Sequence, residues 1–474
     1  MAVAIPTNVV QHVRPTTTGG LGMNTVRYHL PNPTLPNNTI LIPIGWAPDT
    51  GVTVSIVDDQ GNTYVQDEAR ADAIETFRVA LLRCNRAVTG TQRIDVTFTG
   101  GQGSFVIGEL IELWGIADTP LDGHSNGNTS SATWATGSFT PSTNNGFIFQ
   151  AAWSDQNSGY TAFTPMAGMA MLGAELKFGY ASQCGIQSVA ASITPTITAS
   201  QGGQFISVSA CYKTDAAKGT APTAEPRIFG VSWVEIHDPT ATTFNWQHPA
   251  KGDLIDIEWV GQGPAEHGDA IARQLASTPA TDNKSNTYTR TTLVQSTNCT
   301  AQHAYAGANP AARATTGSDF TGSITVATAD NAATIAIVDI ICGSSGINFD
   351  KTADATGSQP DGGAVTFGAI TPTNANGIVL GCVGVNANTI QDCTTAGWAT
   401  DSPWGDTEDG NTDGLHEDNF WGHYTSAPAS AIQPTCNQSH MSGAGFGVAD
   451  WAWQAIAFNT PAATTSPMFR GSRG

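Results

Sequence analysis

The chain has 474 residues, enough for two full-sized hydrophobic cores, and only 12% of them are charged while 51 are glycine. Its formal net charge of −20 argues against nucleic-acid binding, because phosphate contacts need lysine and arginine. No run of about 18 apolar residues predicts a membrane span, and the amino-terminal segment lacks the basic start and apolar core of a secretion signal.

Short runs of Val, Ile and Thr between turn signals predict strands along the first half of the chain. We place these strands near 39–46, 52–57, 78–84, 93–98, 104–114, 146–153, 187–198, 205–212 and 228–236. So many short strands suit a two-layer sandwich of jelly-roll or lectin-like size. Only two segments, 67–77 and 264–276, are candidates for short helices.

Several segments of the first half recur in the second half in the same order. DDQGNTY at 58–64 returns as DNKSNTY at 282–288, and TPSTNNG at 140–146 returns as TPTNANG at 371–377. Two weaker matches place Gly115 and Asp122 over Gly343 and Asp350, and 231–243 over 453–465. The offsets are 224, 231, 228 and 222 residues, and such constancy indicates duplication of a unit of roughly 225 residues.

The sequence therefore predicts an all-β protein with little helix, made of two tandem duplicated β-sandwich domains. We expect copy one to cover residues 1–240, copy two to cover 241–465, and 466–474 to form a tail. The repeated DDQGNTY motif has the chemistry of a turn, because glycine and asparagine tolerate positive φ and aspartate caps backbone groups. We interpret it as a landmark of the duplicated fold.

The eight cysteines include no C-x-x-C pair, which argues against zinc ribbons and thioredoxin-like sites. Several of them, such as Cys342 and Cys382, lie within apolar runs, where a buried free thiol is the usual state. The even number of cysteines leaves disulfides open as the alternative.

No catalytic residue is predicted, and we expect the protein not to be an enzyme. The segment GHSNG around Ser125 matches G-x-S-x-G, but the strand and helix that a nucleophile elbow needs do not flank it. Glu109 and Glu112 lie three residues apart on one expected strand and point to opposite faces, so they form a poor acid/base pair. Asp339 aligns with neither of them.

The acidic segment 401–424 is the strongest candidate for a metal site. Asp406, Glu408, Asp409 and Asp413 offer oxygen ligands among glycines, which suits Ca²⁺, although the segment lacks the full EF-hand pattern. A solvated acidic loop is the alternative interpretation. We expect no other cofactor.

Aromatic residues are interleaved with these carboxylates. Trp398, Trp404, Trp421 and Tyr424 would suit stacking on a glycan or contact with a protein partner if they are exposed. Burial in the core is the alternative. The two copies differ most in this region, and loops diverge when they face different partners.

The order NTILIPIGW, VTVSIVDDQGNTY, ELWGIADTPLDG and GSFTPSTNNGFIF resembles β-sandwich domains of structural and adhesion-type proteins of tailed bacteriophages and prophages. Copy two keeps SNTY, FD and TPTNANG but has no equivalent of Trp114. The resemblance covers most of both copies, and it brings no catalytic residues with it.

The resemblance implies a non-enzymatic virion structural protein, made in the host cytoplasm without a signal peptide. The candidate roles are capsid decoration, a head fibre or turret, and a tail-fibre or baseplate component. Its partners would be other virion proteins and further copies of itself, with no nucleic acid or membrane. The alternative is a carbohydrate-binding adhesin that uses loops of the second domain to hold a host-surface glycan, and a glycan-degrading enzyme is the third hypothesis.

Overall fold

β-Strands are the only regular elements among the described residues of this computed structural model, which confirms the all-β class. The structure describes residues 3–14, 25–47, 51–72, 76–100, 105–154, 160–176, 178–223, 226–238, 242–262, 274–297, 299–327, 331–344, 346–360, 364–386, 389–393, 395–396, 398–400, 417–439 and 448–460. None of these residues belongs to a helix that could cross a membrane.

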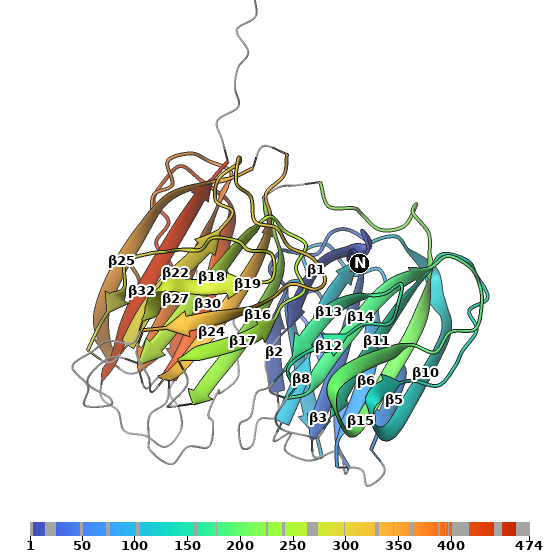
Figure 1. Ribbon diagram of the computed structural model, residues 1–474. Coiled ribbons are helices and arrows are strands. Elements are labelled where there is room, and N and C mark those ends of the chain that lie inside the picture. Colours follow the sequence, from blue (N-terminus) through green and yellow to red (C-terminus); the bar gives the residue numbers. More distant parts are fainter. Residues whose placement is uncertain are drawn as a thin grey trace, which may run out of the picture.

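One sheet of 12 strands runs through both halves of the chain and joins the two lobes seen in Figure 1. From the junction outward, copy one supplies β1 (Val9–Arg14), β9 (Leu110–Leu113), β3 (Thr39–Ala47), β6 (Arg78–Cys84) and β5 (Val65–Ala71), with β8 (Phe105–Gly108) beside β3. On the other side of the junction, again from the junction outward, the sheet continues with β16 (Arg227–Asp238), β24 (Asn331–Ile341), β18 (Leu254–Gln262), β22 (Cys299–Ala306) and β20 (Thr289–Arg290), with β21 (Val294–Gln295) beside β22.

Each half adds a second sheet, of six strands in copy one and five in copy two, with the same strand order. We call it the larger sheet of each copy, because the other sheets of that copy have three strands. In copy one this sheet is β10 (Ile116–Ala135), β15 (Thr196–Thr214), β11 (Gly146–Ser154), β14 (Tyr180–Gln187) and β13 (Ala170–Glu175), with β12 (Phe163–Thr164) beside β15. In copy two it is β25 (Asn348–Pro360), β32 (Val448–Asn459), β27 (Gly377–Asn386), β30 (Glu417–Ala427) and β29 (Ala399–Thr400).

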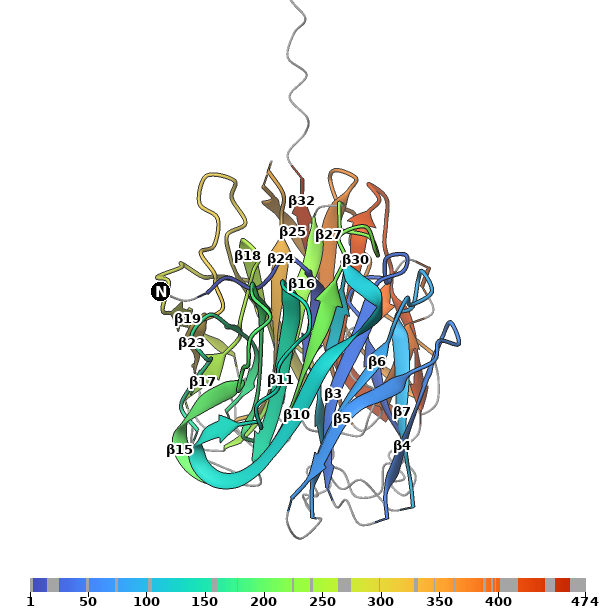
Figure 2. The same cartoon turned by 90° about the vertical axis from the view of Figure 1, so that its right-hand side faces the viewer.

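Small sheets complete the layers. Copy one has β2 (Thr25–His29), β7 (Arg93–Thr99) and β4 (Thr53–Asp58), and copy two has β17 (Thr243–Gln247), β23 (Thr321–Val326) and β19 (Leu275–Asp282) in the equivalent order. A further sheet contains β26 (Val365–Thr366), β31 (Thr435–Ser439) and β28 (Thr389–Cys393). In Figure 2 the three layers of copy one follow one another from left to right, labelled β11, β3 and β7.

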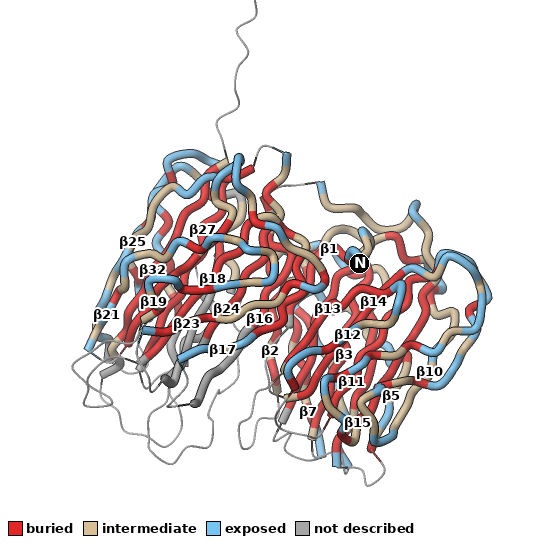
Figure 3. The backbone as a smooth tube through the Cα atoms, in the orientation of Figure 1, coloured by how far each residue is buried: buried red, intermediate tan, exposed pale blue. Residues whose placement is uncertain are grey.

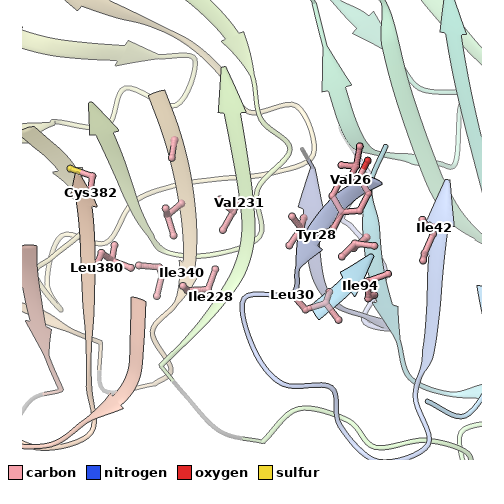
Figure 4. Packing of buried hydrophobic residues seen from close by; sticks show 14 of the residues in the cluster. Val26, Tyr28, Leu30, Ile42, Ile94, Ile228, Val231, Ile340, Leu380 and Cys382 are labelled. Carbon is pink, nitrogen blue, oxygen red and sulfur yellow. The ribbon is translucent and has the colours of Figure 1, made fainter. Parts of the chain in front are cut away.

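The two halves meet at β1 and β16, which are parallel neighbours, with His12 opposite Gly230. Equivalent strands that are adjacent and parallel are related by a two-fold axis along the strands, and such an axis exchanges the two faces of the sheet. The larger sheet of copy two therefore packs on the face that carries the small sheet of copy one. A single apolar cluster follows this face across the junction, from Ile94 through Ile228 to Leu380 (Figure 4).

Buried residues follow the strands through both lobes (Figure 3). Along β3, Ile40 and Ile42 face the small sheet, whereas Leu41 faces the larger sheet, as the two-residue period of a strand requires. Five cysteines are buried and free, which confirms the expected thiols at these positions: Cys84, Cys184, Cys211, Cys342 and Cys382. Cys299 and Cys436 are buried as well. The side chain of Cys393 lies outside the described part of the structure.

Two expectations from the sequence are wrong. Residues 67–71 of the first helix candidate belong to β5, whose residues pair with β6, because tertiary pairing overrides local preference. Most of the other helix candidate, 264–276, lies outside the described residues. The match of 231–243 with 453–465 also fails, since β32 corresponds in sheet order to β15 and not to β16. The boundary at 240 stays a prediction.

Asp339 proves to be the structural equivalent of Glu112, contrary to the sequence alignment. Both pairings contain a bulge at the same place. Leu113 and Glu112 pair with Val9 and Gln11 of β1, and Ile340 and Asp339 pair with Ile228 and Gly230 of β16. Their offset of 227 residues differs by one from that of the nearby glycines, so the spacing alone concealed it. Burial raises the pKa of Glu112 above its usual range and that of Asp339 to about 7.

Candidate functional site: a buried polar centre in copy two

Most of the site expected from the sequence falls outside the described residues. Asp406, Glu408, Asp409, Asp413 and Trp404 all belong to the part of the acidic segment that the structure does not describe. Calcium binding there, and glycan contact through Trp404, stay predictions.

The remaining aromatic candidates are strand residues or lie beside strands. Trp398 is 6% exposed and packs in a core cluster, where a Cβ added to Gly381 would lie 3.0 Å from its ring. Tyr424, on β30, is partly buried against the same cluster. The backbone of Trp421 also lies in β30, but its side chain is not described. The structure thus gives Trp398 the packing role that the sequence left open.

A different group of polar side chains lies buried between the 12-stranded sheet and the larger sheet of copy two. Asp256 and Glu258 are two residues apart on β18, so their side chains share one face. His303 on β22 is the direct cross-strand neighbour of Glu258. The three side chains are 0–1% exposed, and one ligand atom from each lies within 4.8 Å of the others.

Hydrogen bonds fix the imidazole of His303 on both sides. Its Nδ1 lies 2.7 Å from Oδ2 of Asp256, and its Nε2 lies 3.2 Å from the carbonyl oxygen of Gln454 and 3.5 Å from Sγ of Cys382. The backbone N–H of His303 donates to the side-chain oxygen of Gln454 at 3.0 Å. The second oxygen of Asp256, Oδ1, is buried without a hydrogen-bond partner among the described residues.

The neighbours of His303 shift the pKa of its imidazole. Burial by itself lowers the pKa of the imidazole, but the facing Cys382 and the carboxylate of Asp256 raise it well above its usual value. These two neighbours therefore favour a proton on the imidazole, against the effect of burial.

Cys382, His303 and Asp256 contact one another in series as a thiol, an imidazole and a carboxylate, which is the arrangement that activates a thiol nucleophile. Such chemistry requires the substrate to reach Sγ, and all three side chains are 0% exposed within closed layers of strands. The same nitrogen and oxygen atoms can instead hold a metal ion, which needs no route for a large substrate.

Copy one shows which residues occupy the positions of Asp256, Glu258 and His303 when the site is apolar. The equivalent bulges align Ile40 with Ile255, because these residues pair with Glu112 and Asp339 respectively. Counting along β3 and β18 from this pair, Asp256 and Glu258 correspond to Leu41 and Pro43. His303, opposite Glu258, corresponds to Leu81, opposite Pro43.

The facing sheet gives the same result. The repeated turn aligns Gly146 with Gly377 at the starts of β11 and β27, and both ladders then run without a bulge. Cys382 and its cross-strand neighbour Gln454 therefore correspond to Ala151 and Val208, which belong to the apolar core of copy one. The polar centre is a property of copy two and not a requirement of the fold.

Copy one has its own buried polar contact at a different place. Glu109 accepts a hydrogen bond from the hydroxyl of Ser182 at 2.8 Å, and His12 Nε2 lies 3.8 Å from its other oxygen. Sequence reasoning weighed Glu109 only as a partner of Glu112, and it found neither this contact of Glu109 nor the polar centre of copy two. A signal was nevertheless present for copy two, because LIDIEW places carboxylates at alternate positions of an otherwise apolar strand. Comparison with known protein families, curated proteins and solved structures gave no match for the chain.

Proposed function

We propose that the protein is a non-enzymatic structural protein of a tailed-phage virion that acts through assembly and surface display. Beside the motif resemblance, one structural observation carries the proposal: two equivalent halves share a continuous 12-stranded sheet and one apolar cluster that crosses their junction. The parallel pairing of β1 and β16 extends the hydrogen-bonded ladder from one half into the other.

This junction makes the molecule a stiff block. Domains joined by a linker and a small polar interface usually move relative to each other. Here a movement of the halves would break the ladder between β1 and β16 and expose apolar residues such as Val13 and Val231. A block that holds two sets of loops in a fixed relation suits a capsid decoration, a head fibre or turret, or a tail-fibre or baseplate component.

The partners in this proposal are other virion proteins and further copies of the chain. The composition supports it, because few charges and a net charge of −20 fit a protein surface better than nucleic acid. The complete burial of Cys382 and His303 argues against use of this thiol–imidazole pair as a nucleophile.

Mass spectrometry and electron cryo-microscopy of particles from cells that carry the gene test the proposal. We expect the chain in stoichiometric amount on the particle, with density for its two lobes. A protein that is found only free in solution and stays monomeric in analytical ultracentrifugation would contradict a role in assembly. A glycan array with Trp404→Ala as the control would identify the adhesin alternative, through binding that the variant loses.

A further inference from the structure

We infer that Asp256, Glu258 and His303 form a binding site for a divalent transition-metal ion, which lies between the two sheets of copy two. The ligand set of one imidazole nitrogen and two carboxylate oxygens suits Zn²⁺ or Mn²⁺. This inference does not depend on the proposed virion role.

The backbone places the three ligands for one ion. Asp256 and Glu258 reach the same side of β18, and His303 stands opposite Glu258 on β22, so two neighbouring strands supply all three groups. Bond lengths of about 2.0–2.2 Å bring the ligand atoms of a zinc ion to about 3.4 Å from one another. The three groups already lie within 4.8 Å, a difference that side-chain rotation can close.

The surroundings of His303 fit a metal ligand. When Nδ1 turns its lone pair toward an ion beside Asp256, Nε2 carries the proton and donates to the carbonyl oxygen of Gln454, 3.2 Å away. Metal-bound histidines usually donate their second ring N–H to a carbonyl or carboxylate group, which fixes the tautomer and the ring orientation. Gln454 is itself held by a hydrogen bond from its Nε2 to Asp354 at 3.0 Å.

The unpartnered oxygen of Asp256 points to the same ligand. Oδ1 is fully buried and has no hydrogen-bond partner among the described residues, although a buried carboxylate oxygen is costly to leave unpaired. A dication would bind this oxygen and offset the two carboxylate charges that β18 brings into the core.

The internal comparison shows that this fold does not require these groups. Copy one builds the same two sheets with Leu41, Pro43 and Leu81 at the equivalent positions. Buried carboxylates need a partner to be tolerated, whereas the apolar residues of copy one need none. At these positions copy two therefore needs a partner for its carboxylates that copy one does not need, and a bound cation would supply it.

Complete burial makes this a structural site. An ion enclosed between two sheets is taken up during folding and leaves only when the sheets separate, so it contributes to stability. The readouts are consequently metal content and unfolding, neither of which requires a known activity.

The test refolds the full chain from denaturant with Zn²⁺ or Mn²⁺, and with EDTA in parallel, and measures metal content after gel filtration. We expect about one equivalent of ion per chain and a higher unfolding midpoint than in EDTA. Glu258→Gln and His303→Gln should each lower ion retention about tenfold or more. Glu109→Gln, at the buried carboxylate of copy one, is the matched control and should retain the ion.

A variant patterned on copy one keeps the test valid if the single variants fail to fold. D256L/E258V/H303L replaces the trio with apolar residues, as copy one does at Leu41 and Leu81, and should fold without the ion. X-ray absorption at the zinc edge should report nitrogen and oxygen ligands that include one imidazole. The inference is overturned if the unmodified chain retains no more ion than this triple variant, or if the triple variant binds the ion equally well.

Discussion

The turn at Asp58 shows how a single side chain organises a repeated motif. Its carboxylate accepts hydrogen bonds of 2.7–3.0 Å from the backbone N–H groups of Gln60 and Asn62, from the Asn62 side chain and from the Tyr64 hydroxyl. In copy two, Asp282 accepts the equivalent four bonds at 2.8–3.1 Å. The motif is thus one structural device used twice.

Removing this carboxylate should destabilise either copy to a similar extent. We expect Asp58→Ala and Asp282→Ala each to lower the free energy of unfolding by about 3 kcal/mol, because four part-buried hydrogen bonds to a charged acceptor are lost. Urea unfolding measures the effect. Gln60→Ala, at an exposed position of the same turn, is the control and should change stability by less than about 0.5 kcal/mol. Equal effects at Asp58 and Gln60 would show that the network contributes nothing.

The same network predicts a dependence on pH. Burial by itself raises the pKa of Asp58, but hydrogen bonds from Tyr64, Asn62 and Gln60 favour the charged form and bring the pKa below its usual value. The folded-state pKa is therefore lower than the unfolded value of about 3.9. The stabilisation is complete above the unfolded pKa and is lost as the pH falls through the folded pKa.

Asp58→Asn provides the measurement, through urea unfolding at a series of pH values. The difference in unfolding free energy between the two proteins should stay constant from pH 7 to about pH 5 and shrink below about pH 4. A difference that is independent of pH down to about pH 2 would contradict the assigned role of the charge.

Single residues were predictable from the sequence where the physics is local. The turn at Asp58 could be inferred because asparagine, glycine and aspartate act on their own neighbours. The positive φ of Gly61, +72°, and of its replacement Ser285, +61°, agrees with that interpretation. Asp256 and His303 were missed because they are 47 residues apart, and only the pairing of β18 with β22 brings them together.

At the scale of elements, close contact between sheets limits which residues fit a strand. Gly45 on β3 lies under the indole of Trp153 on β11, and an added Cβ would lie 2.6 Å from that ring. Contacts this short force the sheets apart or turn the indole out of its rotamer. The glycine therefore sets the distance between the 12-stranded sheet and the larger sheet of copy one.

Gly45→Ala should accordingly cost about 1–3 kcal/mol of unfolding free energy. Gly202→Ala on β15 is the matched control, because its added Cβ would meet nothing closer than 3.5 Å, and it should change stability by less than about 0.5 kcal/mol. Urea unfolding of both variants makes the comparison. Equal stability of the two variants would mean that Trp153 does not press on this strand.

Strands were predictable where apolar runs end in turn residues. The expected strand at 78–84 matches β6, and that at 146–153 falls one residue short of β11. The expected strand at 187–198 was misplaced, because β14 ends at Gln187 and β15 begins at Thr196. Polar positions in long edge strands such as β10 carry no two-residue period, so they gave no signal.

For the whole molecule, duplication could be inferred from collinear motifs, but the union of the copies could not. The join depends on β16 lying between β1 and β24, and neither neighbour is near it in sequence. Parallel pairing between strands more than 200 residues apart leaves no local pattern. The two halves that meet at β1 and β16 therefore have matching strand orders and share one continuous sheet.

This continuity predicts that the chain unfolds in one cooperative transition. Val96 and Ile324 occupy equivalent positions in the small sheets of the two copies, and both are buried. Val96→Ala and Ile324→Ala should each cost about 2–4 kcal/mol. Because the apolar cluster and the sheet cross the junction, each variant should lower the midpoint of the single transition in calorimetry.

Independent domains would behave differently. Each substitution would then shift only the transition of its own half, and the heat-absorption curve would split into two peaks. Two peaks that respond separately to Val96→Ala and Ile324→Ala would contradict the rigid block on which the proposed structural role rests. A single peak that shifts with either substitution would show that the pairing of β1 with β16 couples the unfolding of the two halves.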